Sequence, residues 1–291
     1  MPSNRPGPSA ARSRQRVAVR RRRRRLILLL VLAVVVAGGW FGGRQLVRSV
    51  ASPKCTITAG GMTETFDPEQ TGNAALIAAL AVKRQMPPRA ATIALTTAFQ
   101  ESKIRNLRFG DRDSLGLFQQ RPSQGWGTEE QILDPVHATN AFYDALEKFK
   151  GYESADITTI AQRVQKSGYP EAYRDHEGQG RVLASNLTGH SPAGLTCRLD
   201  PVKGAVATPR QVAGDLAEQM GVTTVRAGDG SLTVTTRSIT TAWAVAQWAV
   251  ARADAYGATK VTVGDRAWDR ASGDQGWSSG SDGTTVTIRL G

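Results

Sequence analysis

The sequence contains few of the residues that bind metal ions. Of its 291 residues two are cysteine and three are histidine, and the histidines, at positions 137, 176 and 190, stand apart from one another. Metal sites need several such ligands at short, regular spacings. No acidic loop has the spacing of an EF-hand, and no glycine-rich turn has the context of a nucleotide-binding loop. The sequence therefore predicts no metal ion, no nucleotide and no other cofactor.

Acidic residues and lysines are absent from the first 50 residues, which instead contain 12 arginines. The formal net charge of the chain is +12, and the excess lies in this segment, because residues 51–291 carry 25 basic and 25 acidic groups. A nucleic-acid-binding domain is expected to carry its positive charge on the folded surface. The distribution of charge therefore predicts no binding to nucleic acid.

An uncharged run of 18 residues, positions 26–43, follows six consecutive arginines. A membrane-spanning helix needs about 20 apolar residues, and arginine-rich flanks stay in the cytoplasm. We therefore interpret 1–25 as a basic cytoplasmic tail, 26–43 as a transmembrane anchor and 44–54 as a stalk. The protein would then be a single-pass protein of the cell membrane, with its later domains outside the cytoplasm. The alternative is a cleavable signal peptide, because Ser49-Val50-Ala51 has a small-x-small pattern.

The two cysteines, Cys55 and Cys197, both follow the predicted anchor. An even pair in an oxidising compartment most simply forms a disulfide bond. The interval between them predicts a bond that joins the two ends of one domain, residues 55–197. A pair of free buried thiols is the alternative.

Helical patterns dominate from about residue 71 to residue 187. Thr128 with Gln131 has the spacing of a capping box, and Asp134 followed by Pro135 fits an N-cap and the first position of a helix. These signals predict an all-helical domain over 55–197.

The composition changes after this domain. Glycine and proline mark a linker over 198–207. Residues 208–291 then combine two helical patterns with three β-branched runs, "SLTVTT", "TKVTV" and "TTVTIRL". This order of elements predicts a small α+β domain.

The helix that leads to Glu101 has no charged residue between positions 90 and 99. A helix of this kind is expected to be buried on most sides. Burial of Glu101 at its end would raise the pKa of the carboxyl, as a general acid near neutral pH requires. The alternative is a solvated glutamate at a helix C-terminus, where the macrodipole disfavours negative charge.

Three short motifs follow one another here: Gln100-Glu101-Ser102, Gly110-Asp111-Arg112 and Gly116-Leu117-Phe118-Gln119. Together they resemble the lysozyme-like superfamily, in particular soluble lytic transglycosylases and goose-type lysozymes, over roughly residues 70–187. The run "SLGLFQQRPSQGWGT" also resembles segments of actinobacterial cell-wall and surface proteins. The resemblance implies an α-helical lysozyme-like fold and peptidoglycan glycan strands as the binding partner.

The resemblance also implies roles for single residues. Glu101 would protonate the glycosidic oxygen, Ser102 would orient Glu101, and Asp111 would be a second catalytic acid. The cleft that holds the sugar backbone would be lined by Leu117, Phe118 and Gln119.

Two departures from the family pattern concern the surroundings of Glu101. Arg121 stands where goose-type enzymes carry an acid, which favours either a transglycosylase or a weaker hydrolase. The motif Ala-Tyr-Asn-Ala-Gly, whose tyrosine holds the catalytic glutamate, is replaced by "VQKSG" at 164–168, which has no tyrosine. We therefore expect Gln165 to bind the carboxylate, with Tyr169 or Tyr173 reaching it from the next helix.

The resulting functional prediction is a membrane-anchored, extracytoplasmic glycosidase that cleaves peptidoglycan, either a lytic transglycosylase or a muramidase. The alternative is a catalytically inactive protein that binds glycan or serves as a scaffold in a cell-wall or secretion complex. The sequence indicates no particular protein partner. Trp126, between two glycines, is interpreted either as a sugar-stacking residue or as part of the core.

Overall fold

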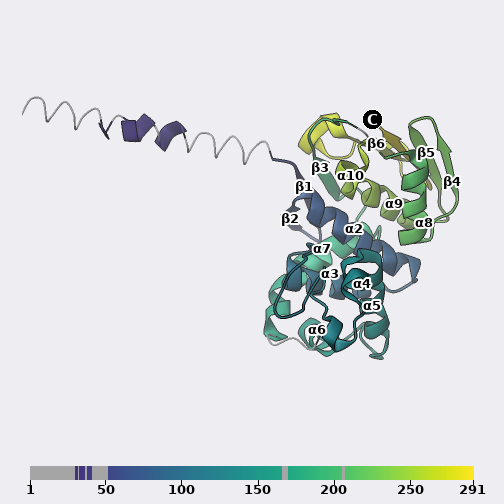
Figure 1. The fold of residues 1–291 in the computed structure, drawn as a ribbon. Helices are drawn as coiled ribbons and strands as arrows, with labels where there is room; N and C mark the ends of the chain where they lie inside the picture. Colours follow the sequence, from purple (N-terminus) through teal and green to yellow (C-terminus); the bar gives the residue numbers. More distant parts are fainter. Residues whose placement is uncertain (1–29, 32, 37, 41–51, 166–169, 205–206) are drawn as a thin grey trace, which may run out of the picture. The chain divides into compact units, whose positions relative to one another are not determined.

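The structure is a computed structural model that describes residues 30, 31, 33–36, 38–40, 52–165, 170–204 and 207–291. The chain divides into two units, Met1–Ser52 and Pro53–Gly291. The second unit holds the candidate site and all the helices and strands named below (Figure 1).

The predicted transmembrane anchor is not found among the residues that the structure describes. Within 26–43 the structure describes residues 30, 31, 33–36 and 38–40, which are helical and exposed; the remainder of that segment, with 1–25 and 44–51, lies outside the described residues. Among the described residues, no helix is long and apolar enough to cross a membrane. A span requires about 20 consecutive residues of helix. The expectation of a single-pass protein of the cell membrane is corrected accordingly.

The prediction of an all-helical domain over 55–197 is also wrong. Strands β1 (Lys54–Ala59), β2 (Met62–Phe66) and β3 (Leu195–Arg198) form an antiparallel sheet in the order β2-β1-β3. β1 and β2 form a hairpin around Gly60 and Gly61, which both have positive φ. Two-residue hairpin turns favour glycine at such positions. The two glycines, between runs rich in threonine, were the local signal for this sheet.

The predicted disulfide bond is confirmed. Cys55 and Cys197 are bonded and lie directly opposite each other on β1 and β3. Both side chains are fully buried. The bond therefore joins the first and last strands of the segment that surrounds the candidate site.

Helices form most of the chain between β2 and β3. Two short 3-10 helices, η1 (Pro122–Gln124) and η2 (Pro170–His176), accompany six α-helices: α2 (Pro68–Lys83), α3 (Pro88–Ser102), α4 (Glu129–Leu133), α5 (Pro135–Glu147), α6 (Ile157–Gln165) and α7 (Glu177–Leu187). Both predicted helix starts are confirmed: Thr128 and Gln131 form a capping box at α4, and Asp134 caps α5. Local hydrogen bonding at these positions determines where the helices begin.

The C-terminal part combines helices with a second antiparallel sheet. Helices α8 (Pro209–Met220), α9 (Ile239–Ala251) and α10 (Ala253–Tyr256) accompany strands β4 (Val225–Gly228), β5 (Ser231–Thr235), β6 (Ala258–Val263), β7 (Arg266–Asp269) and β8 (Thr285–Leu290). The strand order is β4-β5-β8-β6-β7. The three predicted strand runs form β5, β6 and β8 at the centre. The edge strands β4 and β7 are four residues each and were not predicted.

Residues 55–197 and 208–291 share one hydrophobic core. Gln247 of α9 is fully buried and connects them. Its Oε1 accepts a hydrogen bond from Leu195 N at 3.0 Å, and its Nε2 donates to Asn186 O at 2.6 Å and to Ser191 O at 3.1 Å. A buried amide with this many partners requires both segments to be folded against each other.

We expect Gln247→Leu to destabilise both segments together. The substitution removes the partner of Leu195 N–H, at a cost of about 1–3 kcal/mol for a buried group left unsatisfied. The carbonyls of Asn186 and Ser191 each lose one hydrogen bond and keep those from Gly189 N and Gly194 N. Urea unfolding should show one transition at a lower midpoint. Gln275→Leu, at an exposed position, should change the free energy of unfolding by less than about 0.5 kcal/mol. Separate transitions for the two segments in the parent protein would contradict a shared core.

Candidate active site

Helix α3 presents Glu101 at its C-terminal end. The helix begins with Pro88 at its first turn and buries every residue from Ala90 to Ala98, which confirms the predicted buried helix. It ends because Lys103 and Ile104 have positive φ, the left-handed conformation that stops a helix. Glu101 is thus fixed in the last turn of a helix that is held on most sides.

Two side chains bind the carboxylate of Glu101. The hydroxyl of Tyr173, in η2, donates a hydrogen bond to Glu101 Oε1 at 2.5 Å. The side chain of Gln165, at the end of α6, makes a second hydrogen bond to the carboxylate. Gln165 Nε2 also donates to Phe118 O at 2.6 Å, which fixes the amide against the loop beside α3. The carboxylate is therefore held from two elements other than its own helix.

Burial raises the pKa of Glu101 above its ordinary value, while the hydrogen bonds from Tyr173 and Gln165 act in the opposite direction. Burial disfavours the charged form of a carboxyl, and donors to the carboxylate favour it. The net shift is upward, so burial dominates. A carboxyl that keeps its proton at higher pH and lies within reach of donors has the properties of a general acid.

Ser102 supports the loop beside Glu101. Its hydroxyl donates to Leu117 O at 2.7 Å and contacts Ala98 O at 3.1 Å, and its Oγ accepts from Arg105 N at 3.1 Å. The buried hydroxyl thus joins the end of α3 to the segment that contains Phe118. It acts on the backbone of that segment, in place of the predicted contact with Glu101.

The side chains of Leu117 and Phe118 lie in the core and are fully buried. Phe118 stacks on Phe142 of α5, with ring centroids 4.6 Å apart. They therefore do not line a cleft as the resemblance implied. Their contribution to the site is the carbonyl of Phe118, which receives the hydrogen bond from Gln165.

The side-chain amide of Gln119 contacts backbone carbonyls of the loop that precedes it. Its Nε2 lies 3.3 Å from Gly116 O and 3.4 Å from Phe109 O. A Cβ atom at Gly110 would lie 1.8 Å from Gln119 Oε1 and 2.7 Å from the backbone oxygen of Ser114, so a larger residue there would require the loop to shift. Gln119 therefore packs the loop around 109–116.

Asp111 is exposed, with 93% of its side chain accessible, and faces Arg112 at 4.0 Å. Asp113 is the acid that is bound, since its carboxylate accepts from Ser123 N at 2.9 Å and from Arg121 Nε at 2.6 Å. The hydrogen bond from Ser123, which has the larger effect, and that from Arg121 hold the pKa of Asp113 well below its usual range. Among the residues that the structure describes, neither aspartate hydrogen bonds to Glu101. The pairing of Asp113 with Arg121 was not foreseen from the sequence.

Tyr169 lies outside the described residues, and Tyr173 is the tyrosine that reaches Glu101. His176, in the same short helix, lies against α3: its ring is 4.6 Å from that of Phe99, and its Nε2 is 3.2 Å from Lys103 Nζ. Burial and, secondly, the charge of Lys103 lower the pKa of His176, so its Nε2 accepts a hydrogen bond from the lysine ammonium. These contacts hold η2, and with it Tyr173, against α3.

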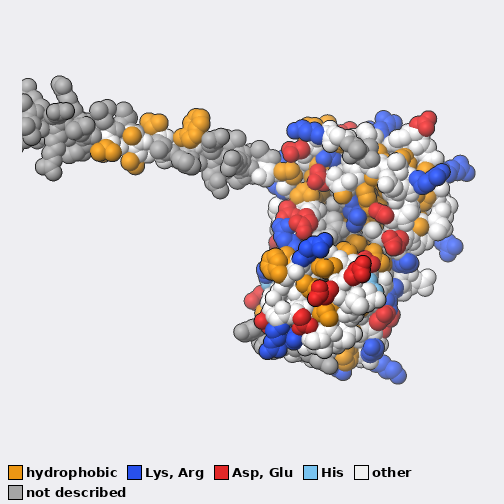
Figure 2. Space-filling view, in the orientation of Figure 1, with side chains coloured by type: hydrophobic (Ala, Val, Ile, Leu, Met, Phe, Trp, Pro, Cys, Tyr) orange, Lys and Arg blue, Asp and Glu red, His pale blue; other side chains and the backbone are white. Residues whose placement is uncertain are grey.

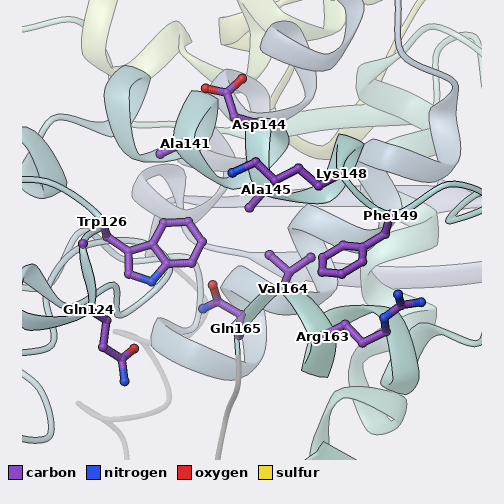
Figure 3. A pocket seen from close by; sticks show the side chains of 11 residues that line it. Gln124, Trp126, Ala141, Asp144, Ala145, Lys148, Phe149, Arg163, Val164 and Gln165 are labelled. Carbon is purple, nitrogen blue, oxygen red and sulfur yellow. The ribbon is translucent and has the colours of Figure 1, made fainter.

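A pocket with a volume of about 610 Å³ begins at Gln165 (Figure 3). Figure 3 shows the rings of Trp126 and Phe149 on either side of Val164 and Gln165. Trp126 is half-buried, so one part of the indole packs on the core and another lines the pocket. Gln165 also binds Glu101, so a single side chain separates this pocket from the carboxylate.

The face of the second unit in Figure 2 carries acidic and basic side chains side by side.

Among the described residues, no group of three or more histidine, cysteine, aspartate or glutamate side chains is placed to hold a metal ion.

No protein-family model matches the chain, and no curated protein sequence is significantly similar to it.

Proposed function

We propose that the protein cleaves the glycan strands of peptidoglycan and that Glu101 is its general acid and base. The observation that carries the proposal is a half-buried carboxyl whose pKa is raised and which Tyr173 and Gln165 hold by hydrogen bonds. Gln165 also lines a pocket of about 610 Å³. Cleavage of a glycosidic bond requires a proton on the leaving oxygen while positive charge develops on the sugar ring. The resemblance of the motifs around Glu101 to lytic transglycosylases and goose-type lysozymes supports the same reaction.

The exposed position of Asp111 favours a transglycosylase over an inverting hydrolase. An inverting hydrolase needs a second carboxylate, about 6.5–9.5 Å from the first, to activate water. Asp111 is solvated, and Asp113 is bound to Arg121. In the transglycosylase reaction the 6-hydroxyl of the muramic acid attacks the anomeric carbon. Glu101, having given its proton to the leaving oxygen, then accepts the proton of that hydroxyl.

Digestion of purified peptidoglycan sacculi with the full chain tests the proposal. Mass spectrometry of the soluble products should show fragments that end in 1,6-anhydromuramic acid. Reducing ends would instead identify a hydrolase. If neither product appears above the level of a buffer control, the glycosidase proposal is wrong.

A protein that binds glycan without cutting it is the second candidate. It is favoured by one observation: Arg121 is engaged by Asp113, at the place where the resemblance expects an acid. The same digestion distinguishes the two candidates, because such a protein would sediment with sacculi and release no fragments.

Tyr173→Phe should change the pH dependence of cleavage. The variant lacks the hydroxyl that donates to ionised Glu101, and this hydrogen bond lowers the pKa of the carboxyl. Its loss raises that pKa further, so the general acid stays protonated to higher pH and the alkaline limb of the activity profile moves upward. Tyr256→Phe is the matched control, because its hydroxyl donates to Asp215. An unchanged alkaline limb in Tyr173→Phe would show that this hydrogen bond does not tune Glu101.

A further inference from the structure

We propose that the pocket beside Gln165 binds an anionic substituent of the glycan strand, a carboxylate or a phosphodiester, and that Lys148 and Arg163 recognise its charge. This inference rests on the proposed function and identifies the part of the substrate that the pocket selects. The site is distinct from Glu101, which would act on the glycosidic bond itself.

The pocket is placed to receive a group attached to the sugar at the cleavage point. Gln165 lines the pocket and also hydrogen bonds to the carboxylate of Glu101. A glycan whose glycosidic oxygen meets Glu101 would therefore carry its nearest substituents toward the pocket. The volume of about 610 Å³ lies within the range of pockets that hold small ligands.

The charges that line the pocket favour an anion. Its ionisable residues are Lys148, Arg163 and Asp144. Arg84 binds Asp144 at 2.6 Å and Glu147 at 2.5 Å, so its one positive charge is shared between two carboxylates and Asp144 is offset in part. In the described part of the chain, no carboxylate lies within 4 Å of Lys148 or Arg163, both of which are exposed. The lining therefore has an excess of positive charge, and its two cations form no ion pair with a carboxylate of the described residues.

The ring of Phe149 restrains one of the two cations, Arg163. The guanidinium of Arg163 lies 4.4 Å from the ring centre of Phe149, and stacking of this kind restricts a long side chain while leaving its N–H groups available. Figure 3 shows Lys148 extending over the pocket from the end of α5. Across the pocket, Trp126 offers an apolar face of the type that packs against a sugar or an aliphatic chain.

Carboxylates and phosphates are both ligands that arginine and lysine bind in proteins. Peptidoglycan offers two sources of such groups, the peptide attached to muramic acid and phosphodiester polymers attached to the wall.

Both cations also lie at C-terminal ends of helices, where their positive charge interacts favourably with the negative end of the helix macrodipole. A binding measurement therefore has to separate ligand recognition from an effect on folding.

The test measures binding of the full chain, carrying Glu101→Gln to prevent turnover, to three forms of purified sacculi. The first is intact, the second is treated with an amidase that removes the peptides, and the third is treated with hydrofluoric acid, which removes phosphodiester polymers. We expect Lys148→Gln with Arg163→Gln to weaken binding to intact sacculi at least about tenfold, which corresponds to about 1.4 kcal/mol. The control is Lys150→Gln with Arg226→Gln, which removes the same charge outside the pocket and should bind as the parent does.

The stripped sacculi identify the source of the anion. Weaker binding after amidase treatment assigns the pocket to peptide carboxylates, and weaker binding after acid treatment assigns it to phosphodiesters. Equal binding to all three forms would overturn the proposal, as would an equal loss in the control variant. A lower melting temperature confined to the pocket variant, with binding per folded molecule unchanged, would also overturn it.

The anion site and the glycosidase reaction can each fail without the other, and the measurements distinguish the two failures. If the parent protein releases no fragments from sacculi while the pocket variant loses binding, the glycosidase proposal fails and the anion site stands. If the parent cleaves sacculi and the pocket variant binds and cleaves them equally well, the anion site fails alone.

Discussion

Glu101→Gln is expected to lower the rate of glycan cleavage by about 10²–10⁴-fold, the usual contribution of a general acid. Glutamine fills the same space and can accept the hydrogen bond from Tyr173, but it has no proton to give to the glycosidic oxygen. Product release from sacculi, measured by mass spectrometry, provides the rate. Glu153→Gln, at an exposed position, is the control and should cleave at the parental rate.

The same substitution should leave the protein at least as stable at neutral pH. Because burial raises the pKa of Glu101 in the fold, its contribution to stability is fully present below the unfolded pKa, which is about 4.3, and is lost as the pH rises through the folded pKa. Above that point the parent carries a half-buried charge that the glutamine variant lacks. The melting temperature of Glu101→Gln should therefore equal or exceed that of the parent at pH 7.

An inactive variant that also melts several degrees below the parent would contradict this account, because the loss of activity would then come from the fold. Full activity in a stable Glu101→Gln protein would show that another group supplies the proton.

Loss of the disulfide bond is the second large effect that we expect. Cys55→Ala with Cys197→Ala should lower the free energy of unfolding by about 2–5 kcal/mol. The two residues are 142 positions apart, and a bond that closes a long loop removes much of the conformational freedom of the unfolded chain. Denaturant unfolding of the oxidised parent and the double variant measures the difference.

Reduction of the parent provides an independent control for this experiment. The reduced parent should unfold close to the double variant, since both have lost the same constraint. A difference of less than about 1 kcal/mol between oxidised and reduced protein would mean that pairing of β1 with β3 alone secures this end of the sheet.

Local signals in the sequence predicted several features correctly. The capping box of α4 and the N-cap of α5 depend on residues one to three positions apart, so they could be identified directly. The buried character of α3 followed from its lack of charge. The partner of Cys55 needed no geometry, because the chain has one other cysteine.

Features that depend on contacts between distant segments were missed or left open. The sheet β2-β1-β3 brings together strands from both ends of the helical segment, and its outer strands are five and four residues long. Short strands carry a weak periodic signal and are stabilised by their neighbours. The apolar run at 26–43 gave a strong local signal for a span, and no such helix occurs among the described residues.

The sequence by itself determined that Glu101 lies at the end of a buried helix, because the charge-free face of α3 is a property of adjacent residues. Only the tertiary structure decided which groups surround that carboxyl. Tyr173 lies 72 positions away and reaches Glu101 because His176 and Phe99 hold η2 against α3. The sequence motifs predicted a role for Ser102 at the carboxylate, while packing directs its hydroxyl to Leu117. Hydrogen bonds between elements depend on how those elements pack, and residue spacing along one helix does not contain that information.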